Sequence, residues 1–236
     1  MRKLLPAALL ALTGCALLRI SLLSDLYLRY VKEGLRPLLI VSGVVLVLLA
    51  LLAVLRVRHH DGGAEAVDHG HTHAAAGPRT AWLLAIPAVM LLLFAPPALG
   101  SYTVARDGSG AVAKRTTFAA LPARSPLALS LADFTSRAVW DEKGSLRGRT
   151  VELTGFVTPH GSGSWQLSRV IVSCCAADAR VLKVEIHGLA APPGDSWVTV
   201  TGTWRPDAKV PALDATGLDR IPRPKNPYRD VARPRP

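Results

Sequence analysis

The stretch GFVTPHGSGSWQLSRVIVSCCAADA, residues 155–179, decides the fold of the C-terminal half of the chain. It contains two runs of β-branched and aromatic residues, separated by a Gly-Ser-Gly-Ser segment at 161–164. Two such runs around a short Gly/Ser segment predict a β-hairpin. The second run ends at two adjacent cysteines, Cys174 and Cys175, with Asp178 just behind them. We expect a small domain to be built around this hairpin.

Further strand-like runs and one short helix flank the hairpin. Ser130, with Asp133 three residues later, is a capping-box pattern that predicts a helix to about Trp140. Residues near period two predict strands at 150–157, 165–173, 180–187 and 197–204, with a weaker one at 210–218. One helix and about five short strands favour an OB-like β-barrel over 127–228, with a β-sandwich fragment as the alternative.

The first hundred residues have the composition of a membrane region. Half of the 236 residues are hydrophobic, and the mean hydropathy is +0.28. Each of three apolar runs is close to the ~20 residues that a bilayer requires, and they lie at 4–23, 38–55 and 81–99. The sequence therefore predicts a multi-pass protein of the cell membrane, with three transmembrane helices within 1–100. A linker at 101–126 would join them to the β domain, and a basic Pro/Arg tail at 229–236 would end the chain.

The first apolar run allows three interpretations. A cleaved signal peptide would need a small-residue cleavage site and a polar mature start. A lipoprotein signal is suggested by Leu12-Thr13-Gly14-Cys15, but the residues after Cys15 stay apolar. We favour a retained transmembrane helix, in which Arg19 reaches the outer interface. The pair Ser42-Gly43 in the second run would let another helix approach closely.

The positive charges give an orientation. Arg2 and Lys3 precede the first run, and Arg56, Arg58 and Arg79 lie between the second and third. The positive-inside rule places both segments in the cytoplasm. Three spans with a cytoplasmic N-terminus then place the C-terminal domain outside the cytoplasm. Because it follows the membrane region directly, membrane lipid is an expected partner.

The loop at 56–80 holds five of the seven histidines, His59, His60, His69, His71 and His73. Neutral imidazole is a good ligand for divalent transition metals such as zinc, and a flexible chain lets several imidazoles converge. The spacing matches no defined site, so weak, adaptable metal binding is expected. The alternative is a polar linker that is rich in histidine.

The stretch RVIVSCCAADA, residues 169–179, resembles the YcgQ-type family of bacterial membrane proteins, which are described as permease-associated subunits. The motif is Arg-x-x-Ile-x-Cys-Cys-x-Ala-Asp-Ala, carried here by Arg169, Cys174, Cys175 and Asp178. Similar segments lie at 197–202 and 224–228, and the likeness extends over most of the chain. The resemblance implies membrane helices and pairing with a separate multi-span permease. It implies no reaction and no substrate.

Strict alternation along the second strand predicts unequal thiols. Val170, Val172 and Cys174 would share an apolar face toward the core, whereas Cys175 would share a polar face with Arg169. Cys174 would then be inert, as buried cysteines commonly are, and Cys175 would carry any metal or redox role together with Asp178. A vicinal disulfide is a further alternative. The alternative role for Asp178 is a turn cap. The candidate ligands His160 and His187 should lie at the opposite end of the hairpin.

Three functions follow from these features. We favour a membrane-anchored accessory subunit of a permease, linked to handling of transition metals. A single-stranded nucleic-acid binder would need stacking aromatics, for which Trp165, Trp197 and Trp204 are weak evidence, and a domain outside the cytoplasm is not expected to meet nucleic acid. A thiol-dependent redox or metal-binding protein would rely on the two cysteines, although no Cys-x-x-Cys motif is present. No enzymatic activity is expected.

Overall fold

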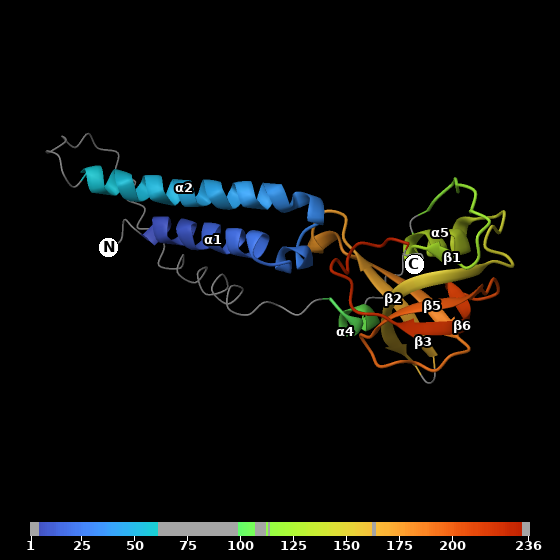
Figure 1. Ribbon diagram of the computed structural model, residues 1–236. Helices are drawn as coiled ribbons and strands as arrows, with labels where there is room; N and C mark the ends of the chain where they lie inside the picture. The colour runs from blue at the N-terminus through green and yellow to red at the C-terminus, as the bar shows by residue number, and fades with distance from the viewer. Residues whose placement is uncertain (1–4, 61–98, 107–111, 113, 162–163, 233–236) are drawn as a thin grey trace. The chain divides into compact units, whose positions relative to one another are not determined.

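The chain folds into two compact units, residues Met1–Pro97 and Ala98–Pro236. The computed structural model describes residues 5–60, 99–106, 112, 114–161 and 164–232 (Figure 1). The first unit is helical and the second is mainly β, which confirms the predicted order of a helical region and a β domain.

The N-terminal unit is a hairpin of two apolar helices. Helix α1 spans Leu5–Leu22, and α2 spans Arg36–His60. The connection holds two 3-10 turns, at Leu26–Arg29 and Glu33–Leu35, and is short enough to make the helices antiparallel (Figure 1). A Cβ added to Gly14 would lie 2.8 Å from the carbonyl oxygen of Gly43. Glycine at both positions therefore allows the close approach that the sequence predicts for Gly43.

One described helix is a clear candidate for a membrane span. The segment Glu33–Val57 is long and apolar enough to cross a bilayer, and α1 is a shorter apolar helix. The prediction of three spans is therefore supported for one of them, which is consistent with membrane anchoring near the N-terminus. Of the third expected span, 81–99, all but Leu99 lies outside the described residues.

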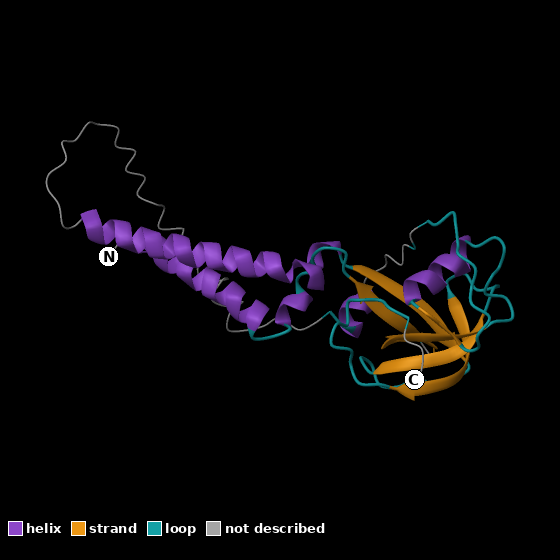
Figure 2. Cartoon of the chain, turned by 45° about the horizontal axis from the view of Figure 1, so that its top comes forward, coloured by secondary structure: helices purple, strands orange, loops and turns teal. Residues whose placement is uncertain are grey.

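The second unit contains a short helix before the domain core, then strands with one further helix (Figure 2). The helices are α4, Ser101–Arg106, and α5, Leu131–Trp140, and a 3-10 turn covers Ala176–Asp178. The strands are β1 Leu127–Leu129, β2 Thr150–His160, β3 Ser164–Ile171, β4 Arg180–His187, β5 Trp197–Trp204 and β6 Ala212–Arg220. The predicted strands are all present, whereas α4 and β1 were not predicted. Helix α4 falls where the sequence predicts a linker.

The strand pairings form a closed series. Strand β2 pairs antiparallel with both β3 and β5, β3 pairs antiparallel with β4, β4 pairs parallel with β6, and β6 pairs antiparallel with β5. Strand β1 adds a parallel partner for β2. The register between β5 and β6 shifts at Thr201/Gly202. A Cβ on Gly202 would collide with the carbonyl oxygen of Asp214, so the shift requires glycine there.

The β domain contains two hydrophobic clusters. The main core fills the inside of the sheet, where side chains such as those of Trp165, Leu167 and Val184 are fully buried. The second core joins α4 and the C-terminal segment to the sheet, and comprises Val104, Phe156, Val170, Val181, Trp197 and Tyr228. Residues on both faces of β3 are consequently buried.

Helix α5 has two separate caps at its N-terminus. The Ser130 hydroxyl accepts a hydrogen bond from the backbone N–H of Asp133 at 3.1 Å, which confirms the predicted N-cap. The Asp133 carboxylate pairs with Arg137 at 3.0 Å. Asp230 supplies the second cap, because its two oxygens accept from the backbone N–H groups of Leu131 and Ala132 at 3.2 and 2.7 Å. Part of the predicted basic tail is thus fixed against the domain.

Candidate functional site

The paired cysteines lie in a tight turn between β3 and β4. Strand β3 ends at Ile171, and the 3-10 turn Ala176–Asp178 precedes β4. One carboxylate oxygen of Asp178 accepts from the backbone N–H of Ser173 at 2.9 Å, and the other accepts from that of Cys174 at 2.7 Å. Asp178 therefore closes the turn, as the turn-cap alternative predicts, but its bonds reach back four and five residues and not forward as in an Asx turn.

The electrostatics of the turn favour a carboxylate and a protonated thiol. The Cys174 thiol, together with the backbone N–H of Ser173, lowers the pKa of Asp178. Conversely, the Asp178 carboxylate and the neighbouring Cys175 thiol raise the pKa of Cys174 to about 11. Cys174 is therefore a thiol rather than a thiolate at neutral pH, and its nucleophilicity is suppressed although the side chain is exposed.

The two sulfur atoms are close together. The Sγ atoms of Cys174 and Cys175 lie 3.6 Å apart, and both cysteines are free. Cys174 is exposed and Cys175 is half-buried. The arrangement presents two soft donor atoms on one side of a solvent-accessible turn, which suits a thiophilic ligand or an oxidant of dithiols.

The prediction that Cys174 is packed in the core is wrong. Alternation predicts burial only while the strand continues, and β3 ends three residues before Cys174. Alternation correctly placed Val170 and Val172 on one buried face, but it wrongly predicted that the opposite face is polar. Trp165 and Leu167 belong to the main core and Val170 belongs to the second core, so the strand has no polar face beneath the cysteines.

Arg169, which was expected on a polar face beside Cys175, is fully buried. Its guanidinium donates to the carbonyl oxygens of Thr154 at 3.0 Å and of Arg229 at 2.6 Å. Its Nε lies 3.5 Å from the carboxylate of Asp230, and its Cζ lies 5.3 Å from the ring centroid of Trp197. The first residue of the motif therefore anchors the C-terminal segment to β3 rather than activating a thiol.

Sequence reasoning missed the partner of this arginine. Asp230 lies in the stretch that the sequence predicts to be a basic tail, 61 positions after Arg169 and beyond the last strand, β6. One signal was available, because an arginine between Leu167 and Ile171 in a strand of this core needs a buried acidic partner. Asp230 is the only acidic residue after Asp219.

The candidate metal ligands are not brought together in the described part of the chain. His59 and His60 end α2, whereas His69, His71 and His73 lie outside the described residues. Within the described ranges, no group of three or more His, Cys, Asp or Glu side chains is placed to hold a metal ion. Metal binding by Cys175 and Asp178 stays a prediction.

The two remaining histidines lie where the hairpin geometry predicts. His160 pairs with Ser164 at the β2–β3 turn, and His187 ends β4. The cysteine turn follows the opposite end of β3, where Ile171 pairs with Arg180. A closed four-ligand site that combines these histidines with the thiols is therefore incompatible with the register of β3 and β4.

Comparison with known proteins identifies the family. No curated protein matches the chain. The DUF1980 N-terminal domain matches residues 8–110, which include most of α1 and all of α2 and α4. The DUF1980 C-terminal domain matches residues 131–229, from the first turn of α5 to the residue before Asp230. The two matches together cover most of the chain, and the protein therefore belongs to the DUF1980 family.

Proposed function

We propose that the protein is a membrane-anchored accessory subunit of a multi-span permease, inserted by several N-terminal helices and carrying its C-terminal domain outside the cytoplasm. The observation that carries the proposal is the outer surface of α2. This surface presents large apolar side chains that no other described element covers, at Leu38, Val41, Val44, Val45, Leu48, Leu49, Leu51, Leu52 and Leu55.

A surface of this kind requires an apolar environment. Leu38 and Val41 are 62% and 58% exposed, and Leu48 is 51% exposed. Soluble monomers rarely expose a continuous apolar patch of this length. Ala50, by contrast, is 4% exposed, on the side of α2 that contacts α1. The outer surface therefore suits lipid tails or the helices of a second membrane protein.

For the C-terminal domain we propose an OB-like barrel that serves as a binding module. The closed series of pairings from β2 to β6 and back supports a barrel over a β-sandwich fragment. The domain offers little to a single-stranded nucleic acid through its strand tryptophans. Trp165 and Trp197 are buried in the cores and cannot stack on bases, and Trp204 is half-buried against the main core.

A second candidate is metal handling by the paired thiols. The 3.6 Å separation of the two sulfur atoms favours a soft or borderline ion such as zinc. A partner subunit would have to complete the coordination, since two thiols and one turn-closing carboxylate leave the site open. Isothermal calorimetry with zinc tests this, with Cys174→Ser/Cys175→Ser as the matched control. Equal heats for both proteins would exclude the thiols as ligands.

The experiment on the main proposal uses photo-crosslinking in membranes. A photoreactive residue at Leu48 should crosslink to a co-purifying multi-span protein, whereas the same residue at Ala50 should crosslink within the chain. Resistance of the protein to alkaline carbonate extraction tests anchoring separately. Full extraction by carbonate would contradict membrane insertion. Insertion with lipid-only crosslinks at Leu48 would contradict the permease partner.

A further inference from the structure

The C-terminal segment returns to the point where the chain enters the β domain. The Tyr228 hydroxyl accepts a hydrogen bond from the backbone N–H of Leu99 at 3.2 Å. Tyr228 is also buried in the second core together with Val104 of α4. Leu99 is the last residue of the apolar run 81–99. The proposed membrane anchoring through this run would place Leu99 at the lipid surface, and with it the segment around Tyr228.

This segment is basic and is held in a fixed orientation. Four basic residues and no acidic residue lie between Arg220 and Arg229. Pro224, Pro227 and Tyr228 are buried, whereas the basic side chains are exposed. The side-chain oxygen of Asn226 accepts from the backbone N–H of Tyr228 at 3.1 Å and fixes the turn. The exposed basic side chains are those of Arg220, Arg223, Lys225 and Arg229.

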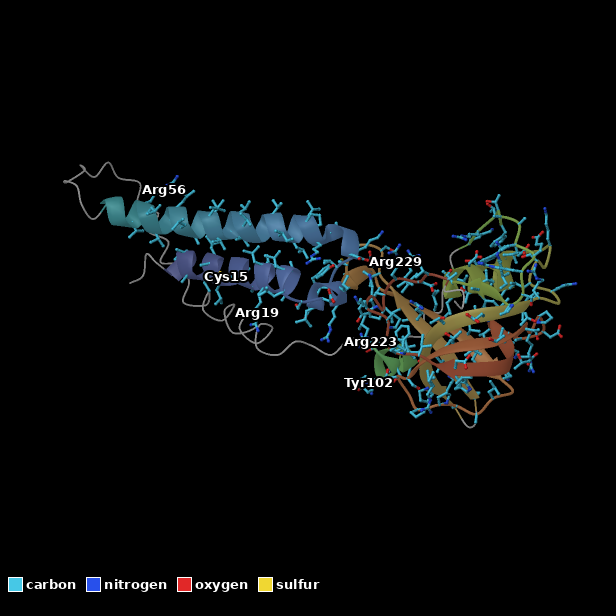
Figure 3. The ribbon with its side chains drawn as sticks, viewed as in Figure 1. Cys15, Arg19, Arg56, Tyr102, Arg223 and Arg229 are labelled. Carbon is cyan, nitrogen blue, oxygen red and sulfur yellow. The ribbon has the colours of Figure 1, made fainter. Side chains whose placement is uncertain are left out.

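Helix α4 extends the same surface. Tyr102 is 69% exposed, and the guanidinium of Arg106 lies 3.9 Å from its ring centroid. The acidic neighbour Asp195 is engaged by the backbone N–H of Ser101 at 2.6 Å and by its hydroxyl at 2.8 Å. Figure 3 shows Tyr102, Arg223 and Arg229 along one edge of the C-terminal domain. An exposed tyrosine beside arginines is typical of a membrane interface.

We propose that α4 and the segment Arg220–Arg229 form a docking surface for anionic phospholipid headgroups, here called the headgroup surface. The inference rests on the proposed membrane anchoring, which keeps Leu99 at the bilayer. Charge complementarity favours headgroup phosphates as the occupant, since the segment carries four exposed basic residues and no acidic residue. Each basic residue close to an anionic surface should strengthen docking about fivefold at moderate ionic strength.

The test uses the full-length protein reconstituted in nanodiscs of phosphatidylcholine, with or without phosphatidylglycerol. An amine-reactive ester labels exposed lysines, and mass spectrometry measures the labelling rate of Lys225 against that of Lys209. Lys209 is exposed in the loop between β5 and β6 and serves as the internal reference. Phosphatidylglycerol should slow the labelling of Lys225 about fivefold, and high salt should restore it.

A charge-removing variant and a matched control complete the test. The double variant Arg223→Gln/Arg229→Gln should abolish the protection of Lys225. It keeps the main-chain carbonyl of residue 229, which accepts the hydrogen bond from Arg169. Lys143→Gln/Arg147→Gln removes two exposed charges from the loop before β2 and should leave the protection unchanged. Free inorganic phosphate added to phosphatidylcholine nanodiscs should give no protection.

The outcomes separate the two proposals. Equal labelling of Lys225 in both kinds of nanodisc, in a protein that inserts normally, would overturn the headgroup surface and leave membrane anchoring intact. Protection by inorganic phosphate alone would overturn lipid as the occupant. Failure of the protein to associate with nanodiscs would overturn both proposals together.

Discussion

The two ends of the motif at 169–178 behave in opposite ways. Arg169, a charged residue, is fully buried, whereas Cys174, a residue type that is commonly buried, is exposed. Alternation along the strand predicts the reverse for both. The difference shows that burial here depends on what covers each face of β3 and on where the strand ends.

Each end is stabilised by an aspartate from further along the chain. Asp230 lies beside buried Arg169 and also caps α5. Its carboxylate therefore balances the charge of the guanidinium and accepts hydrogen bonds from free N–H groups at the start of the helix. Asp178 instead closes an exposed turn. Asp230 should contribute far more to the stability of the domain than Asp178. Without Asp230 a buried positive charge would lack a partner, whereas water solvates the exposed turn around Asp178.

The largest effect is expected for Asp230→Ala. It leaves the Arg169 guanidinium buried without its carboxylate and removes one cap of α5, which should lower the free energy of unfolding by about 3–5 kcal/mol. Asp230→Asn keeps an oxygen for the helix cap and should cost less. Urea denaturation of the full chain in detergent, followed by tryptophan fluorescence, measures both. A loss of under about 1 kcal/mol in Asp230→Ala would show that the pair adds nothing beyond a cap.

A smaller effect is expected for the other cap of α5. Ser130→Ala removes the acceptor for the backbone N–H of Asp133 and should cost about 1 kcal/mol. Ser130→Gly should lower the free energy of unfolding by only about a few tenths of a kcal/mol, because glycine leaves the helix terminus open to water. The same denaturation assay applies. If Ser130→Ala were as damaging as Asp230→Ala, capping would explain the whole contribution of Asp230.

Asp178→Asn should change the chemistry of the turn and leave the stability of the domain nearly unchanged. Loss of the negative charge should lower the pKa of Cys174 from about 11 toward its ordinary value of 9.0. Alkylation of Cys174 near pH 8 should then accelerate by up to about tenfold, since the gain in thiolate exceeds the loss of nucleophilicity. Mass spectrometry of iodoacetamide-treated protein measures the rate, with Cys175 as the internal control. An unchanged pH profile at Cys174 would contradict the assigned role of Asp178.

The smallest effect is the pH dependence of the turn. Because folding lowers the pKa of Asp178 below 3.8, its carboxylate stabilises the turn fully above that value. The contribution is lost as the pH falls through the lowered pKa. Hydrogen exchange of peptides covering residues 172–179, corrected for intrinsic rates, should therefore show constant protection from neutral pH to about pH 4. Loss of protection at a higher pH, in the wild-type protein but not in Asp178→Ala, would contradict the lowered pKa.

Much of the β domain follows from local sequence. Strands β4 and β5 coincide with their predicted bounds, and Ser130 caps α5 as the capping pattern indicates. These features depend on neighbours within a few residues, which a sequence displays directly. Helix α4 was missed because six residues beside Pro96-Pro97 carry no helical period. Its helical state depends on Val104, which is buried against distant residues of the second core.

The sequence by itself determined the apolar helical region, strands β2 to β6 and the N-cap of α5, since each depends on composition or on contacts close along the chain. It gave the turn cap of Asp178 only as one of two alternatives. Only the tertiary structure decided the closed series of strand pairings, the exposure of Cys174, and the burial of Arg169 against Asp230. The physical reason is the distance along the sequence between the residues that interact. A buried guanidinium is stable only where a distant carboxylate and two carbonyl oxygens converge on it, and no local pattern records that convergence.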